Sequence, residues 1–174
     1  MSNEVLPFVV RMATDRDFKG ISKLKEEVQQ LHIEGRPDLY ANTSASLDRN
    51  TYEIWLDDTN IEVFVVEDNN KEILAYMILD IKEPSNNPIL LERKTLFIRN
   101  IGVSELCRGT GIGKTLVQKV FEYAKEIQAT SVELNVLEFN EKAIRFYEKL
   151  GFKTKSRQME CVLPNGGHHT CPST

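Results

Sequence analysis

A short glycine-rich segment between an apolar strand and an amphipathic helix most restricts the fold of this 174-residue chain. In CRGTGIGKTL, residues 107–116, Gly109, Gly111 and Gly113 alternate with other residues. The apolar pattern of residues 95–103 predicts a strand before the segment, and helical spacing over 112–127 predicts a helix after it. Three alternating glycines are unfavourable in a turn without a ligand, because glycine loses the most backbone entropy on ordering. The segment therefore favours a strand–loop–helix unit that approaches a phosphate.

Two common phosphate-binding patterns fit this segment poorly. A Walker loop, G-x-x-x-x-G-K-[ST], would need a glycine at the position of Arg108, and Gly109 lies one residue too close to Gly113. The dinucleotide pattern G-x-G-x-x-G would need a glycine in place of Lys114. These misfits disfavour both nucleotide-binding alternatives, and the cost of ordering three glycines disfavours a turn without any ligand.

The remaining chain predicts alternating strands and helices in one domain. Strands are expected over residues 8–14, 61–67, 73–81, 95–103, 132–137 and 154–163, and helices over about 14–35, 47–56, 112–127 and 140–150. This order predicts an α/β (α+β) protein with a mixed sheet and helices on both faces. The single domain takes in residues 1–174, with a core over about 8–163 and a flexible tail over 164–174.

Composition restricts the compartment and the partners. The net charge of −4 argues against non-specific nucleic-acid binding, which needs a basic face. The three cysteines are widely spaced, in no metal-ligand or disulfide pattern, so we expect a reducing cytoplasm and no metal. No signal peptide is recognisable, and no apolar run approaches the roughly 20 residues that span a membrane.

Three segments of the chain resemble the GNAT superfamily of N-acyltransferases. Residues 103–116, with Arg108, Gly111 and Gly113 in the pattern R-x-x-G-x-G, resemble its central strand, loop and helix. Residues 140–152, NEKAIRFYEKLGF, resemble its second characteristic segment, and residues 11–17 resemble its usual beginning. The resemblance implies a mostly antiparallel sheet of about six to seven strands, flanked by about four helices, with splayed central strands.

The resemblance also implies acetyl-CoA as co-substrate and no metal. The pantetheine arm would lie along the strand, and the pyrophosphate would meet backbone N–H groups at the positive end of the following helix. The implied acetyl-CoA-binding residues are Ile101, Gly102, Val103, Arg108, Gly109, Thr110, Gly111, Ile112, Gly113, Lys114 and Asn140. The Arg108 side chain would hold either the loop or the ligand.

Tyr147 stands where the family commonly has its general acid. A phenol with a pKa near 10 is a suitable proton donor to a leaving thiolate. The alternative is that Tyr147 is an ordinary core residue, because it lies on the apolar side of its helix. Asn140, which commonly contacts the CoA arm in the family, is also expected to cap that helix.

The position of a general base is where this sequence departs from the family. Many relatives have an acidic residue on the central strand, where this chain has Arg99 and Asn100. Glu34, Glu67 and Glu133 are left as alternatives, together with a water chain or no base at all. Arg99 and Asn135, the latter expected mid-strand, are candidates for substrate binding.

These features predict a cytoplasmic acetyl-CoA-dependent N-acetyltransferase that acts directly on the primary amine of a small molecule, such as a polyamine, amino acid or aminoglycoside. The alternatives are a protein N-terminus or lysine as acceptor, and an acyl-CoA-binding module without turnover. No nucleic-acid or membrane partner is expected, and a homodimer is compatible with the family.

Overall fold

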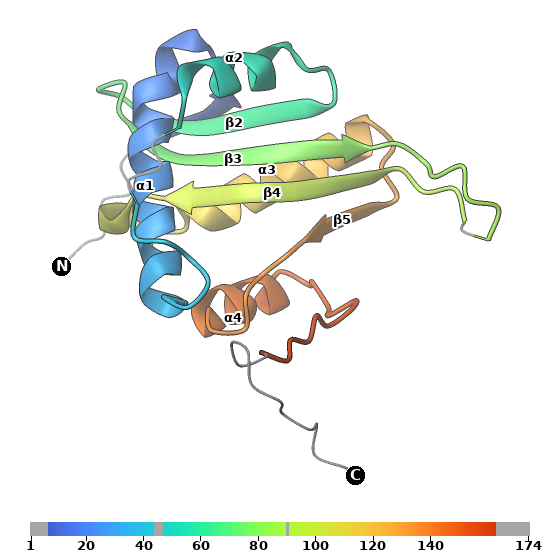
Figure 1. The fold of residues 1–174 in the computed structure, drawn as a ribbon. Helices are drawn as coiled ribbons and strands as arrows, with labels where there is room; N and C mark the ends of the chain where they lie inside the picture. Colours follow the sequence, from blue (N-terminus) through green and yellow to red (C-terminus); the bar gives the residue numbers. More distant parts are fainter. Residues whose placement is uncertain (1–6, 44–46, 90, 163–174) are drawn as a thin grey trace.

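The computed structural model describes residues 7–43, 47–89 and 91–162 of the chain. Figure 1 shows one sheet, with α1 and α2 over one face and α3 over the other. The strands are β1 (Phe8–Met12), β2 (Ile61–Asp68), β3 (Ile73–Lys82), β4 (Thr95–Val103) and β5 (Ser131–Leu134). The helices are α1 (Phe18–Gly35), α2 (Arg49–Asp57), α3 (Ile112–Glu126) and α4 (Glu141–Lys149), with short 3-10 turns η1 (Asp15–Asp17) and η2 (Glu105–Cys107).

The strands lie in chain order, β1-β2-β3-β4-β5. The first four pair antiparallel, and β4 pairs with β5 in parallel. The mixed, mostly antiparallel sheet and four α-helices are therefore confirmed for the described residues. A parallel neighbour for β4 requires a crossover, and α3 supplies it.

The sheet has five strands in the described part of the chain, not the six to seven expected. The strand expected over residues 154–163 does not form over 154–162, and residue 163 lies outside the described ranges, as does the expected tail. The charged residues of this segment are separated mostly by polar ones. Each charge pairs with a different segment: Lys155 with Glu133, Arg157 with Glu138, and Glu160 with Arg36. Met159 stays 87% exposed, so no apolar face holds the segment against the sheet.

The sheet is buried on both faces. One core lies under α1 and α2, and its members include Ile21, Tyr52, Val65, Tyr76 and Ile78. The other lies against α3 and α4, and its members include Met77, Leu96, Ile98, Leu116 and Tyr147. Because neighbouring residues of a strand point to opposite faces, β2 and β3 are apolar almost throughout rather than alternating.

A charged network joins the start of the chain to the sheet. The Arg11 guanidinium donates to Asp17 at 2.7 Å and, through Nε, to Glu67 at 2.6 Å. Asp17 also accepts from the backbone N–H of Thr14 at 2.8 Å, the contact expected of a capping-box residue. The network thus fixes the entry to α1. None of the helices that the structure describes has both the length and the hydrophobicity to cross a bilayer.

Candidate active site

The candidate site begins where β4 and β5 separate. Their pairing runs from Thr95 with Ser131 to Ile98 with Leu134 and stops there, although β4 continues to Val103. The edge of β4 over residues 99–103 thus faces no strand among the described residues, as the expected splaying requires. Ile101, Gly102 and Val103 lie on this stretch, and their backbone is the part of β4 that a ligand can approach.

A β-bulge in β4 marks the same point. Ile98 is paired with Leu79 and Asn100 with Ile78, which leaves Arg99 as an extra residue. A bulge bends its strand and turns side chains to new directions, and bulges are common beside active sites. The bulge therefore explains why β4 leaves β5 directly after Ile98.

The glycine loop needs its glycines for backbone conformation. Gly109 has a φ of 83° and Gly111 a φ of 96°, both in the left-handed region that other residues rarely adopt. A Cβ added at either glycine would meet nothing within 4 Å. The space in front of the loop is therefore open, and the requirement at these two positions is conformational.

Several backbone N–H groups of the loop have no acceptor. Those of Arg108 and Thr110 bond to the carbonyls of Glu105 and Cys107, at 3.3 and 3.4 Å. Within the described residues, no acceptor exists for the N–H groups of Gly109, Gly111, Ile112, Gly113 and Lys114. Gly111 is the N-cap of α3 and has no side chain to cap it, so the positive end of a 15-residue helix stays open. These free N–H groups can bind a phosphate. A side chain that capped the helix would already have used them.

The side chains of the loop act mainly on the loop itself. Arg108 donates from Nε to the carbonyl of Val103 at 3.3 Å, which ties the loop to the end of β4. Thr110 donates from its hydroxyl to the carbonyl of Cys107 at 2.7 Å. The first of the two roles open to Arg108, holding the loop, is thus present in the structure.

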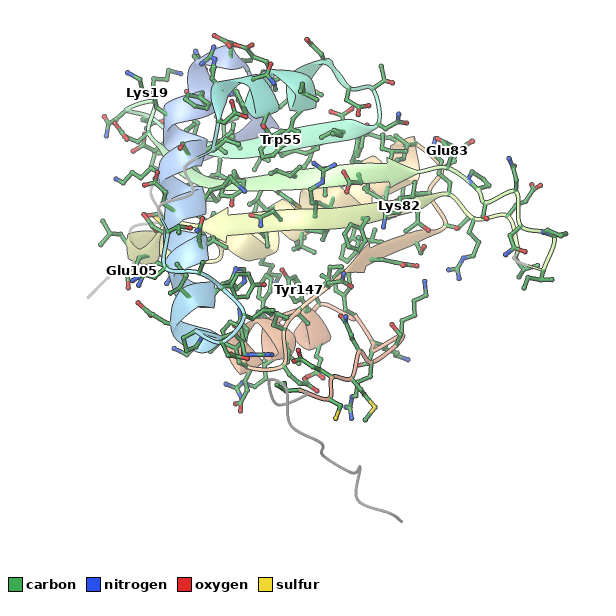
Figure 2. All side chains as sticks on the ribbon, in the orientation of Figure 1. Lys19, Trp55, Lys82, Glu83, Glu105 and Tyr147 are labelled. Carbon is green, nitrogen blue, oxygen red and sulfur yellow. The ribbon has the colours of Figure 1, made fainter. Side chains whose placement is uncertain are left out.

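Tyr147 has a buried ring and a free hydroxyl. The ring is 8% exposed and packs against Phe146 and Phe152, with centroids 5.2 and 5.5 Å away. Figure 2 shows it between α4 and the sheet. Its hydroxyl has no hydrogen-bond partner in the described structure. Every fully buried polar side-chain atom of the described residues has such a partner, so the Tyr147 hydroxyl must be in contact with solvent. Burial raises the pKa of Tyr147 to about 12.

The other tyrosines of the two cores use their hydroxyls structurally. Tyr52 donates to the carbonyl of Thr14 at 2.7 Å, Tyr123 to Glu62 at 2.7 Å, and Tyr76 to Asn100. A tyrosine that only filled the core would be expected to bond its hydroxyl in the same way. The free hydroxyl is thus evidence for a role of Tyr147 beyond packing.

Asn140 caps α4, as expected. Its Oδ1 accepts from the backbone N–H of Ala143 at 3.1 Å, which leaves its Nδ2 group available. Asn135, in contrast, does not lie mid-strand: β5 ends at Leu134, and Asn135 is the exposed first residue after it. The strand is shorter than expected because β4 turns away at the bulge and removes the partner that a longer β5 would need.

Arg99 and Asn100 both have partners that the sequence did not reveal. Arg99 donates to Asp80 on β3, at 2.9 Å from Nε and also from Nη2. Asn100 accepts from the hydroxyl of Tyr76, whose pKa is raised by complete burial. Gly102 lies opposite Tyr76, where a Cβ would come within 2.4 Å of the ring, so this glycine leaves room for the tyrosine.

The three carboxylates left as alternative bases are engaged elsewhere. Lys71 and Arg11 bind the buried Glu67 and lower its pKa to about 2. Lys155 pairs with Glu133 at 2.7 Å and lowers its pKa, and Glu34 accepts from Gln30 at 2.9 Å. Glu67 and Glu133 are therefore held in ion pairs, whereas the exposed Glu34 has one hydrogen bond from a neighbouring side chain. The described residues contain no group of three or more potential metal ligands.

Comparison with known proteins places these features in a family. The family model described as "Acetyltransferase (GNAT) family" matches residues 25–152. An uncharacterised N-acetyltransferase of Methanocaldococcus jannaschii is 36% identical over 104 residues, 60% of this chain and 45% of that protein. An L-ornithine N5-acetyltransferase of Arabidopsis thaliana is 29% identical over 67% of this chain and 50% of that protein. The chain therefore spans about half the length of these curated relatives.

A crystal structure of a tetramutant of the BH1408 protein from Bacillus halodurans is similar throughout. It has a TM-score of 0.85 and 30% identity, over 89% of this chain and 99% of that one. A solved structure thus shares the fold of this chain.

Proposed function

Because the chain belongs to the GNAT acetyltransferase family, we propose that it moves an acetyl group from acetyl-CoA to a primary amine of a small molecule. The observation that carries the proposal is the row of N–H groups without acceptors at the start of α3. Gly109, Gly111, Ile112, Gly113 and Lys114 would hold the pyrophosphate there, with Arg108 keeping the loop in place. Their open positive helix end fits the charge of this group.

The exposed edge of β4 and the N-cap of α4 complete the proposed acetyl-CoA site. Ile101, Gly102 and Val103 would align the pantetheine arm, and the free Nδ2 of Asn140 would donate to it. Bound acetyl-CoA supplies an acetyl thioester. The backbone N–H groups of β4 beyond the bulge would polarise its carbonyl, as fixed donors do for a developing oxyanion.

Tyr147 is the proton donor in this proposal. In the overall transfer a C–N bond forms, a C–S bond breaks, the amine loses one proton and the sulfur gains one. Because its pKa is raised to about 12, the Tyr147 hydroxyl stays protonated at neutral pH and is in the form that can donate a proton to the leaving sulfur. A free hydroxyl on a ring fixed by packing is suited to this step, because the donor is positioned without being bonded to another protein group.

Small-molecule acceptors are favoured over protein amines by the curated relatives. One relative is named an L-ornithine N5-acetyltransferase, and another, from Trypanosoma brucei brucei, a glucosamine 6-phosphate N-acetyltransferase. We also propose the cytoplasm as the compartment, because Cys107 and Cys161 form no disulfide within the described residues, which fits a reducing environment. A binding module without turnover is the second candidate, favoured by the engagement of Glu67 and Glu133 in ion pairs.

Thermal unfolding in the presence of acetyl-CoA, CoA, ATP and NAD tests the proposal. A ligand at 100 times its Kd adds about 2.7 kcal/mol of stability, which raises the Tm of a protein of this size by about 5–10 °C. We expect that shift with acetyl-CoA and CoA alone. A shift with ATP or NAD in their place would refute the acetyl-CoA site. Acetyl-CoA binding without acetylation of any amine would favour the binding module.

A further inference from the structure

Two cationic side chains lie on the face of the sheet that α1 and α2 cover, and one of them is at the β4 bulge. Arg99 is the extra residue of the bulge and directly follows Ile98, the last residue of β4 paired with β5. Lys25 lies on α1, and its Nζ is 5.5 Å from the centroid of the Trp55 ring on α2. Figure 2 shows Trp55 on this side of the sheet. The charge of Arg99 is close enough to Lys25 to lower its pKa, in addition to the larger effect of burial.

The charges at this place do not balance. Asp80 is the one carboxylate within ion-pair distance of Arg99 in the described residues, and it occupies Nε and Nη2. Lys25 is half-buried and has no hydrogen-bond acceptor or carboxylate partner there. Two cations thus share a single anion, although the chain as a whole has a net charge of −4. Removing an ammonium from water is unfavourable unless an anion or acceptor compensates, so this group lacks its counter-charge.

The position of the excess charge relates it to the proposed transfer. Tyr147 belongs to the core on the α3 side, whereas Lys25 and Arg99 lie on the α1 side. Arg99 lies on β4 directly after its last pairing with β5, at the start of the unpaired edge that the proposed acetyl-CoA site uses. An acceptor that approaches from the α1 side would therefore place its amine where β4 and β5 separate. The rest of the acceptor would then lie against the two cations.

We propose that Lys25 and Arg99 bind an anionic group of the acceptor, a carboxylate or a phosphate, so that the acceptor is a small amine that also carries a negative charge. This inference rests on the proposed acetyl transfer. It selects amino acids and amino-sugar phosphates, and it disfavours polyamines and aminoglycosides, whose ionised groups are all cationic. The Arg99 guanidinium can form directed hydrogen bonds, and the Lys25 ammonium acts as a point charge. Both groups occur in carboxylate and phosphate sites.

Matched pairs of amines test the inference through kinetics. Each pair differs by the anion alone or nearly so: ornithine with putrescine, and glucosamine 6-phosphate with glucosamine. For any pair that the enzyme acetylates, we expect kcat/KM to be at least tenfold higher for the anionic member. Lys25→Gln should remove most of this preference through an increase in KM. Lys23→Gln, an exposed lysine on the same helix, is the matched control and should retain it. Equal or reversed preference in the wild-type protein would overturn the inference.

A binding measurement separates this inference from the proposed function. Inorganic phosphate is titrated into protein already saturated with CoA, so that the glycine loop is occupied. We expect the Kd of phosphate to rise at least fivefold in Lys25→Gln and to be unchanged in Lys23→Gln. Saturable phosphate binding without acetylation of any amine would contradict the proposed activity and leave the anion site standing. Acetylation of amines with no phosphate binding, or with binding that Lys25→Gln does not weaken, would contradict the anion site alone.

Discussion

Replacement of Gly111 by alanine should destabilise the protein in proportion to the strain at one backbone position. Gly111 has a φ of 96° and a ψ of −9°. An L-residue in the left-handed region costs about 1–2 kcal/mol. An added Cβ would meet nothing within 4 Å, so no steric overlap adds to this value. For a protein of this size, 1 kcal/mol corresponds to about 2–4 °C, and Gly111→Ala should lower the Tm by about 2–8 °C.

Gly113→Ala is the matched control two residues away. Gly113 has no positive φ, and an added Cβ would lie 3.5 Å from Phe146 and 3.7 Å from Val103, in ordinary van der Waals contact. Alanine is favoured over glycine in a helix by about 1 kcal/mol. Gly113→Ala should therefore leave the Tm unchanged or raise it. At about 2–4 °C per kcal/mol, the increase should be no more than about 4 °C.

Calorimetric titration with CoA extends this comparison to the site. Strain at Gly111 would be relieved by rotation of the backbone, which would turn the neighbouring N–H groups away from a common ligand. A hydrogen bond to a charged group contributes about 1.5–3 kcal/mol, so the loss of one should raise the Kd at least about tenfold. If Gly111→Ala unfolds at the wild-type temperature and binds CoA with wild-type affinity, the reasoning about both the strain and the N–H groups is wrong.

Three further expectations concern single side chains. Tyr147→Phe should slow turnover about 100-fold and leave the Kd of CoA and the Tm nearly unchanged. The control Tyr123→Phe loses a hydrogen bond to Glu62, so it should lower the Tm and keep normal turnover. Equal turnover in both variants would exclude the proton-donor role. Asn140→Ala should lower the free energy of unfolding by about 1 kcal/mol, because it removes the N-cap of α4. Asn140→Ser should restore the cap and the stability, but titration should show that it still binds CoA more weakly than wild type. Because the pKa of Glu67 is lowered, the ionised Glu67 stabilises the fold fully above its ordinary pKa of 4.5, and this stabilisation is lost as the pH falls toward about 2. The Tm difference between wild type and Glu67→Gln should therefore narrow over that range. A constant difference would contradict the ion pairing of Glu67.

The local elements of this protein were predictable because their signals are local. The helical spacing of apolar residues set α3 within one residue, and Asn140 identified the start of α4. The strand expected over 154–163 failed for a reason that alternation cannot reveal. Its charged residues have partners on other elements, and the apolar Met159 has none.

The site was predictable to the extent that backbone motifs define it. The glycine loop and its open helix end follow from the spacing of Gly109, Gly111 and Gly113. The bulge at Arg99 does not, because it arises from the register between β3 and β4. The pairing of Arg99 with Asp80 depends on that register too, as does the position of Lys25 on a helix packed above it. Contacts between distant segments thus determine the geometry of the proposed acceptor side, and a single sequence contains no direct signal for them.

The short parallel pairing of β5 has a consequence for the motions of the molecule. β5 is held by four backbone pairings on one edge, whereas β3 is paired along both edges. Local opening of a segment requires less free energy when fewer hydrogen bonds and neighbours must be given up. Amide hydrogens of Val132 and Leu134 should therefore exchange with solvent before those of β3. Because α4 follows β5 in the chain, the helix that carries Tyr147 is joined to the strand that opens first, whereas the glycine loop follows β4, which is paired with β3 up to Val103.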